Sequence, residues 1–392
     1  MTKVTLDVGG HLRLPVGHLA HLGLNPGLQF VLESSTDVLR LYAARRDVQK
    51  AYIEVTTRCN LNCAVCVRQV WSDPLHDMAW ETFEKIIEDL RSFPDLQRLV
   101  FGGYGEPLVH PRLPEMLALA STLRVPLTVT TNGLLLDEAM ARCLLTSQVD
   151  WVVISLDTVH TQAYDGARIA GGLDRVLDNA RRLMEFAEQR SEFPLNLGLE
   201  FVATRSNRDH LLRLREIAAD LGATKALVSN LLPHTEAMGD EILYDSDRPL
   251  SLPLSWPVKT TRGIVWGRMD LPRMKWGAWR QCRFVLDRAV VVGWDGGVSP
   301  CYPLMHSYPY YIYGRRKNVS RYVLGNVNDQ SLVDIWQSEE YVRFRAKVLD
   351  FRFMYCVDCG LACDYAENNE DCLGNVPSCA DCLWAQGIIR CP

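Results

Sequence analysis

The feature that most constrains this chain is a repeated alternation of β-rich runs and helical patterns through its middle. Six β-rich runs occur, at residues 50–57, 98–103, 126–133, 151–157, 195–203 and 225–232. Apolar residues recur between them at helical spacing. Repeated β-then-α units predict a parallel sheet covered by helices, and six strands fit a partial barrel better than a closed eight-stranded one. We therefore predict an α/β fold, a partial (β/α)6 barrel of the TIM type, with functional residues at the carboxyl ends of the strands.

Length and composition limit the number of domains, the classes of partner and the cellular location of this chain. A chain of 392 residues can bury one large core and add smaller satellite domains. Its net charge of −5 gives the whole chain no attraction for nucleic acid or anionic lipid. The start, MTKVTLDVGG, lacks the apolar core of a signal peptide, and no long apolar run follows it. We therefore expect a cytoplasmic protein without a membrane segment.

Three clustered cysteines follow the first predicted strand. Cys59, Cys63 and Cys66 form a C-x3-C-x2-C run, and the chain has thirteen cysteines in all. In a reducing compartment this number indicates metal or cluster ligands rather than disulfides. A closed tetrahedral zinc site would need a fourth cysteine nearby, and none follows at such a spacing. Either the fourth ligand comes from far away in the chain, or the site keeps one coordination position open.

The next three strand ends also carry glycine or small polar residues. They read GGYGEP at 102–107, TTNG at 130–133 and Ser-Leu-Asp at 155–157. Glycine lets the backbone approach a ligand closely, although a single glycine-rich turn is more often only a tight turn. Four such strand ends in series, with the cysteine run as the first, favour a site that holds a cofactor.

These four motifs, in this order, resemble the radical S-adenosylmethionine (SAM) superfamily. The resemblance implies that Cys59, Cys63 and Cys66 are the catalytic ligands of a 4Fe–4S cluster, and that SAM completes the coordination of the fourth iron. Reductive cleavage of SAM would then give a 5′-deoxyadenosyl radical, which abstracts hydrogen from a substrate. The implied electron donor is a ferredoxin or a flavodoxin.

The same resemblance implies which residues bind SAM. These cofactor-binding candidates are Gly102, Gly103, Glu106, Asn132, Ser155, Asp157 and Arg168. The two glycines and Glu106 would lie against the methionine amino group. Ser155 would meet the ribose or the carboxylate, and Arg168 would pair with the carboxylate. The alternatives are a helix cap for Ser155 or Asp157 and a solvated surface charge for Arg168.

Nine cysteines lie in the last third of the chain. The spacing from Cys282 through Gly296 to Cys301 resembles the SPASM extension of radical SAM enzymes, which carries auxiliary 4Fe–4S clusters. The later spacing departs from that family. The candidate metal ligands here are Cys282, Cys301, Cys356, Cys359, Cys363, Cys372, Cys379 and Cys382. Nine cysteines, Cys391 included, would fill two four-ligand clusters with one spare, so the allocation stays open. A structural zinc site at Cys379 and Cys382 is the alternative.

Two further stretches bear on the substrate. The tail ENNEDCLGNVPSCADCLWAQGIIRCP and the run SNLLPHTEAM resemble radical SAM maturases associated with tungsten-pterin aldehyde oxidoreductases. The implied partner is that tungsten oxidoreductase or its pterin cofactor, with His234 and Glu236 near the substrate. The alternative for His234 is a turn cap. The rival functions are a peptide-modifying radical SAM maturase and a redox-sensing DNA-binding regulator. Cys143 is expected to be a buried apolar residue of a helix.

The first 46 residues form a separate module. They resemble the AbrB-type swapped-hairpin domain through G-x-L-x-L-P and L-G-L-x-P-G. That fold dimerises and often binds DNA, but the weak positive charge of this part neutralises few phosphates. We therefore expect dimerisation or docking at 1–46, the barrel at 47–240, a connector at 241–280 and the SPASM-like domain at 281–392.

Overall fold

The computed structural model describes most of the chain. The described residues are 5–9, 12–15, 17, 21, 28–35, 38–156, 172–189, 195–244, 253–260, 263–273, 280–312, 314–354 and 370–391. Five of the predicted site residues lie outside these ranges, namely Asp157, Arg168, Cys356, Cys359 and Cys363.

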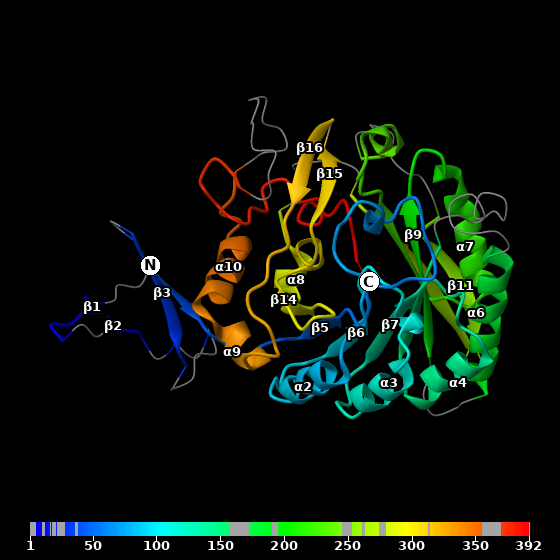
Figure 1. Ribbon diagram of the computed structural model, residues 1–392, viewed down its shortest axis with the longest axis horizontal. Helices are drawn as coiled ribbons and strands as arrows, with labels where there is room; N and C mark the ends of the chain where they lie inside the picture. Colours follow the sequence, from blue (N-terminus) through cyan, green and yellow to red (C-terminus); the bar gives the residue numbers. More distant parts are fainter. Residues whose placement is uncertain are drawn as a thin grey trace.

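A ten-stranded sheet forms the centre of the molecule (Figure 1). Its middle consists of the six predicted strands, paired in parallel in chain order: β5 (Lys50–Ile53), β6 (Arg98–Phe101), β7 (Leu127–Thr131), β8 (Trp151–Ser155), β9 (Asn196–Ala203) and β10 (Lys225–Asn230). The helices between them lie on the outer face: α2 (Trp80–Leu90), α3 (Leu113–Ser121), α4 (Glu138–Thr146), α6 (Gly172–Glu188) and α7 (Leu211–Asp220). The predicted partial barrel is confirmed.

Each helix forms because one apolar stripe faces the sheet. On α2 the stripe is Phe83, Ile86, Ile87 and Leu90, all of them fully buried in the main core. Cys143 on α4 lies beside such a stripe rather than within it, so it is half-buried and not fully buried as expected. Within the described ranges, no helix is long and apolar enough to cross a membrane.

Strands from outside the predicted barrel extend the sheet at both edges. β11 (Ser255–Thr260) and β12 (Gly263–Asp270) form a hairpin, and β12 pairs in parallel with β10. β13 (Ala289–Val292) pairs in parallel with β5, and β14 (Val298–Ser299) follows it. The segment that we expected to be a connector therefore adds two strands to the sheet. The cysteine-rich region is joined to it in the same way.

The C-terminal region packs on the barrel through a second apolar cluster. Its regular elements are α8 (Arg283–Leu286), the hairpin of β15 (Tyr308–Ile312) and β16 (Arg315–Val319), α9 (Leu332–Gln337) and α10 (Glu339–Leu349). Inward-facing Tyr52 of β5 meets Tyr302 edge-on, with 4.9 Å between the ring centroids. This contact places the C-terminal region against the carboxyl end of the barrel.

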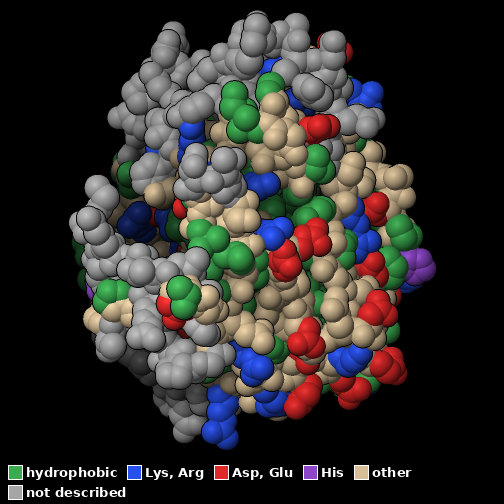
Figure 2. All heavy atoms as spheres, turned by 90° about the vertical axis from the view of Figure 1, so that its left-hand side faces the viewer, with side chains coloured by type: hydrophobic (Ala, Val, Ile, Leu, Met, Phe, Trp, Pro, Cys, Tyr) green, Lys and Arg blue, Asp and Glu red, His purple; other side chains and the backbone are tan. Residues whose placement is uncertain are grey.

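The N-terminal module lies at the opposite end of the molecule from α6 and α7 (Figure 1). It contains the short strands β1 (Thr5–Leu6) and β2 (Leu12–Arg13) and the hairpin of β3 (Phe30–Ser35) and β4 (Val38–Ala43). Arg352, just after α10, holds this hairpin by pairing with Glu33 at 2.9 Å and donating to the Tyr42 hydroxyl at 2.8 Å. Figure 2 looks onto this end, where hydrophobic side chains reach the surface.

Candidate active site

A cavity of about 270 Å³ lies at the carboxyl ends of the barrel strands. It brings together residues from all four sequence motifs: Cys59, Cys63, Cys66, Gly103, Glu106, Asn132 and Ser155 line it. Gly102 precedes Gly103 in the chain. A Cβ atom on Gly102 would lie 2.7 Å from the Tyr302 hydroxyl. Parallel strands end at one edge of a sheet, so motifs far apart in the sequence converge here.

The three cysteines lie close together, at 59–66, in the long loop between β5 and α2. The Cys66 backbone N–H donates to the Cys63 carbonyl at 3.1 Å, and the Leu61 N–H points at the Cys59 sulfur at 3.4 Å. Burial raises the pKa of the Cys59 thiol, and the Leu61 N–H opposes this. Three half-buried thiols on one cavity wall form a donor set that fits an iron–sulfur cluster with one iron left open to a ligand in the cavity.

The glycines of the second motif are explained by close packing against the cysteine loop. Gly103 has a φ of +119°, and a Cβ atom there would lie 2.5 Å from Glu54. A Cβ atom on Gly105 would lie 2.0 Å from the Thr56 carbonyl oxygen. The Glu106 N–H donates to the Arg58 carbonyl at 2.8 Å. The glycines therefore let this loop lie directly on the chain that leads into the cysteines.

Glu106 fixes the position of the third motif. Its buried carboxylate accepts hydrogen bonds from the Thr131 hydroxyl at 2.8 Å and from the Asn132 N–H at 2.6 Å. The Asn132 side chain then donates to Asn60 in the cysteine loop at 2.7 Å. The three strand ends thus form one hydrogen-bonded unit. We expected Glu106 against the methionine amino group, and that contact stays a prediction. The observed bonds give Glu106 a role in holding the cavity wall.

Two polar groups of the cavity were missed by the sequence analysis. Glu200 of β9 accepts a 3.4 Å hydrogen bond from the Ser155 hydroxyl. Asn230 of β10 is 2% exposed and donates to the Ile388 and Arg273 carbonyls. Its Oδ1 atom has no hydrogen-bond partner among the described residues and is a ready acceptor for a ligand. For Glu200 the sequence did offer a signal, because a glutamate within the apolar strand LGLEFVA indicates a functional side chain.

The C-terminal tail completes the cavity wall. Trp384, Ile389, Arg390 and Cys391 all line it, and the Arg390 N–H donates to the Ser229 hydroxyl at 3.1 Å. The Cys391 sulfur accepts from the Trp384 indole N–H at 3.2 Å, and burial raises its pKa to about 12. The tail therefore closes part of the side that a six-stranded barrel leaves open, as Figure 1 allows the reader to follow.

His234 and Glu236, which we expected near the substrate, do not line this cavity. His234 is buried, and its ring lies 3.4 Å from the Leu232 carbonyl. Burial lowers the pKa of His234, while backbone hydrogen bonds at Leu232 and Ala64 oppose this. Glu236 is exposed at the start of a 3-10 helix. His234 therefore braces the turn and the backbone of the cysteine loop.

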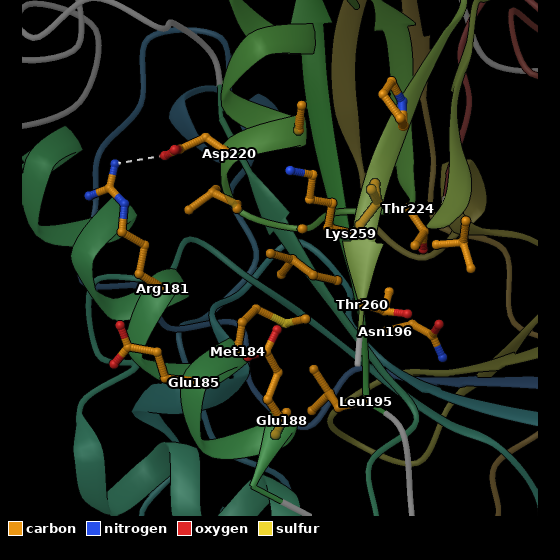
Figure 3. A pocket seen from close by; sticks show the side chains of 18 of the residues that line it. Arg181, Met184, Glu185, Glu188, Leu195, Asn196, Asp220, Thr224, Lys259 and Thr260 are labelled. Atoms are coloured by element: carbon orange, nitrogen blue, oxygen red, sulfur yellow. Dashed lines mark hydrogen bonds and ion pairs between the residues drawn. The ribbon is translucent and has the colours of Figure 1, made fainter. Parts of the chain in front are cut away.

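A larger hollow of about 1160 Å³ lies outside the sheet, between α6, α7 and the β11–β12 hairpin. Figure 3 shows Arg181 and Asp220 paired on one side, and Lys259 and Thr260 on the facing strand. None of the cysteines and none of the strand-end motifs described above lines it. The smaller cavity, with its thiols and glycine loop, is therefore the candidate active site.

A buried ion-pair chain connects the C-terminal region to the active-site loops. His306 binds Glu54 through Nε2 at 2.8 Å and Asp73 through Nδ1 at 2.5 Å. The side chains of His306 and Glu54 are 3% and 0% exposed. Burial alone would lower the pKa of His306, but the two carboxylates outweigh it and raise the pKa to about 9. The other Glu54 oxygen accepts from the Tyr104 N–H at 2.8 Å, so a charged imidazolium supports the glycine loop.

We predict that His306→Gln strongly destabilises the protein, because it leaves the fully buried Glu54 and the half-buried Asp73 without their cation. Breaking a buried ion pair costs roughly 3–5 kcal/mol. The folded pKa of about 9 lies above the ordinary value of 6.5. The contribution of His306 is therefore complete below about pH 6.5 and is lost as the pH rises through about 9.

Urea unfolding from pH 6 to 10 under reducing conditions measures this. The stability difference between wild type and His306→Gln should shrink toward high pH. Glu84→Gln, which removes an exposed carboxylate from α2, is the matched control and should leave the profile unchanged. A difference that is constant over the whole range would contradict a charged His306.

Five cysteines in the described part of the C-terminal region belong to the second apolar cluster. Cys282, Cys301 and Cys379 are buried in it, and Cys382 and Cys391 are half-buried and pack against it. Burial raises the pKa of Cys282 to about 11 and that of Cys382 to about 12, and neighbouring thiols raise that of Cys301 further. Such thiols become thiolates only when a metal replaces their protons, which fits a cluster site. Cys372 is exposed. In the described part of the chain, no three ligating side chains converge closely enough to hold a single metal ion.

Comparison with known proteins agrees with this geometry. Residues 53–187 match the radical SAM superfamily, and residues 282–360 match SPASM, an iron-sulfur cluster-binding domain. The chain is 37% identical over 346 residues to the tungsten-containing aldehyde ferredoxin oxidoreductase cofactor-modifying protein of Pyrococcus furiosus. That alignment covers 87% of this chain and 96% of the relative. The chain belongs to the radical SAM superfamily and carries a SPASM domain.

Other relatives match less of the chain. A PqqA peptide cyclase of Granulibacter bethesdensis is 31% identical over 185 residues, which is 45% of this chain and 46% of the relative. Streptococcus suis SuiB bound to its precursor peptide SuiA has the same fold, with a TM-score of 0.53 at 16% identity, over 77% of this chain and 67% of SuiB. SuiB bound to S-adenosylmethionine also has a TM-score of 0.53, over 81% of this chain and 72% of SuiB. The predicted enzyme class is confirmed, together with SAM, its 4Fe–4S cluster and auxiliary iron–sulfur clusters as cofactors.

Proposed function

We propose that this enzyme modifies the cofactor of a tungsten oxidoreductase, or the oxidoreductase itself during its maturation. The observation that carries this proposal is the alignment with the Pyrococcus furiosus cofactor-modifying protein, which spans nearly the whole of both chains. Peptide cyclases align over less than half of this chain. The likeness to SuiB favours a peptide-modifying maturase as the second candidate. The reaction would take place in the cytoplasm with a ferredoxin or flavodoxin as electron donor.

In this proposal Cys59, Cys63 and Cys66 hold the active cluster. When bound and reduced, the cluster and SAM supply a 5′-deoxyadenosyl radical. The protein's own contribution is to orient SAM and to exclude water. Glu106 and Glu54 fix the loops around the cluster, while Ser155 and Glu200 offer oxygen atoms toward SAM or substrate. The tail from Trp384 onward shields the cavity from solvent.

Reaction with the oxidoreductase tests this function. Reconstituted enzyme, SAM and dithionite should release 5′-deoxyadenosine and change the mass of the cofactor, or of the polypeptide, of a tungsten oxidoreductase produced without this enzyme. Cys59→Ala, Cys63→Ala and Cys66→Ala should each reduce both products below detection. Cys143→Ala on α4 is the control and should retain activity. Release of 5′-deoxyadenosine without any change in the oxidoreductase would disprove this substrate, and cleavage by a triple alanine variant would disprove the cluster assignment.

We assign Cys282, Cys301, Cys379 and Cys382 to one auxiliary cluster. Their common place in the second apolar cluster supports this allocation over a zinc site at Cys379 and Cys382 alone. The second auxiliary cluster would take its ligands from the remaining candidates, Cys356, Cys359, Cys363 and Cys372. Cys391 packs against the same apolar cluster but also lines the active cavity, and it is the spare cysteine in this allocation.

Iron and sulfide analysis distinguishes these sites. Reconstituted wild type should contain about three 4Fe–4S units per chain by the four-thiolate rule. The double variant Cys282→Ala/Cys301→Ala should lose about one unit and still cleave SAM slowly, because its active cluster stays intact. The triple variant at 59, 63 and 66 should also lose one unit but should not cleave SAM. Unchanged iron in the double variant, or stoichiometric zinc in wild type, would overturn the allocation.

We further propose that the N-terminal module joins two chains. On the β3–β4 hairpin, Leu32 and Leu39 are 50% and 53% exposed, and Leu41 is also exposed. An apolar face of this kind becomes buried when two swapped-hairpin modules pair. The module lies at the end of the molecule remote from the outer helices α6 and α7 (Figure 1). Dimerisation through it leaves the barrel cavity of each chain unchanged.

Deleting residues 1–43 should convert the dimer to a monomer in sedimentation. The deletion stops before Ala44 because its carbonyl accepts from Gln337 at 2.8 Å, and Asp47 binds Trp336 at 3.2 Å. SAM cleavage should stay within about twofold of wild type. The full-length variant Leu32→Ser/Leu39→Ser should also be monomeric, which separates the apolar face from the module as a whole. A truncated protein that remains a dimer would refute this role.

A further inference from the structure

A second, smaller cavity lies inside the barrel, nearer the amino ends of the strands. Its volume is about 150 Å³, several times the roughly 30 Å³ of a water molecule. Arg98, Thr128, Trp151 and Lys225 line it, from four different strands. This cavity belongs to none of the motifs described above.

The register of the sheet places this cavity directly beneath the active site. Side chains two residues apart on a strand point to the same face, about 6.5 Å apart along the strand. Gly198 lines the lower cavity and Glu200 the upper one on β9, as do Leu227 and Ser229 on β10. The two cavities are therefore successive layers of one barrel interior.

The lower layer is rich in positive charge. Arg98 begins β6, Lys225 begins β10, and Lys50 is paired with Arg98 in the register of β5 and β6. Burial lowers the pKa of Lys50 to about 8, and Arg98 contributes to this. Burial also lowers the pKa of Lys225, which Asp270 opposes and Arg98 reinforces. Arg98 therefore lies close enough to both lysines to lower the pKa of each.

Carboxylates nearby do not remove this excess. Asp270 faces Lys225 but forms an ion pair of 2.8 Å with Arg268, and Glu200 belongs to the upper layer beside Ser155. Asp287 acts on Lys50 from the side of α8. Among the described residues, those that line the lower cavity include no carboxylate.

A buried hydroxyl also points into this layer without a partner. Thr128 is 4% exposed, and its Oγ1 atom has no hydrogen-bond partner among the described residues. An unsatisfied buried hydroxyl is destabilising unless a ligand binds it. Trp151 adds a flat apolar wall. Two cations, one free hydroxyl group and an aromatic wall form a site for an anion attached to an organic body.

We propose that the lower cavity binds the phosphate group of a small organic substrate whose reacting end reaches the upper cavity. Arg98 and Lys225 bind the phosphate oxygens, and Thr128 donates a hydrogen bond to one of them. This deepens the proposed function and rests on it, because it requires a phosphorylated cofactor rather than a protein side chain as the molecule modified. The bound phosphate lies in the amino-end layer, remote from the cysteine loop.

Binding of inorganic phosphate to the reconstituted holoenzyme with SAM tests this by titration calorimetry. Wild type should bind one phosphate per chain. Arg98→Gln and Lys225→Met should each weaken binding at least about tenfold, and Thr128→Val about threefold. Lys259→Gln, in the outer hollow of Figure 3, is the matched cation control and should bind as wild type does.

Folding is separated from binding in the same variants. Arg98→Gln and Lys225→Met relieve repulsion between cations, so their melting temperatures without phosphate should equal or exceed that of wild type. Phosphate should raise the melting temperature of wild type but not of these two variants. No binding by wild type, or equal binding by all variants, would overturn the site. Phosphate binding that is lost as expected, together with an unmodified tungsten oxidoreductase, would instead refute the proposed function and leave the site standing.

Discussion

The ion pair between Glu54 and His306 is the interaction on which the arrangement of the active site depends. A fully buried carboxylate is stable only when its charge is matched and its oxygens accept hydrogen bonds. Glu54 meets both conditions through His306 from the SPASM side and the Tyr104 N–H from the glycine loop. Asp73 extends the chain to the segment that follows the cysteines. The C-terminal region is therefore a structural part of the candidate active site, and its SPASM domain implies auxiliary iron–sulfur clusters.

Glu106 performs a parallel task one strand further along. Its carboxylate accepts a hydrogen bond from the Asn132 N–H just after β7. The Asn132 side chain in turn donates a hydrogen bond to Asn60 in the cysteine loop. Glu54 directly follows β5, and Glu106 bonds to Thr131 and Asn132 at the end of β7, so the two carboxylates tie the three loops to the sheet. A site built in this way holds its geometry before the substrate arrives, which suits a reaction in which a radical must meet one particular hydrogen atom.

Local patterns in the sequence predicted much of this molecule. Buried parallel strands read as short apolar runs, so β5 to β10 could be located, and the polar residues after them had to meet at one edge. Pairings between distant segments leave no such local pattern. Nothing in the run AVVV indicates that β13 pairs with β5, from which it is far removed in the chain. For the same reason, the sequence did not predict that Cys391 lines the active cavity or that His306 pairs with Glu54.

The charges of the barrel interior have a consequence for the direction in which a substrate binds. Glu200 lies in the upper layer near the cluster loop, whereas Arg98 and Lys225 lie one layer below. Arg390 also lines the upper cavity, whereas the described residues that line the lower one include two cations and no carboxylate. In the proposed site an anionic group is therefore attracted to Arg98 and Lys225, and low-dielectric walls strengthen this attraction. This favours one orientation for a substrate with one charged end. Its uncharged end would then face the cysteine loop, and electrostatics would select the site of hydrogen abstraction without contacts to every atom of the substrate.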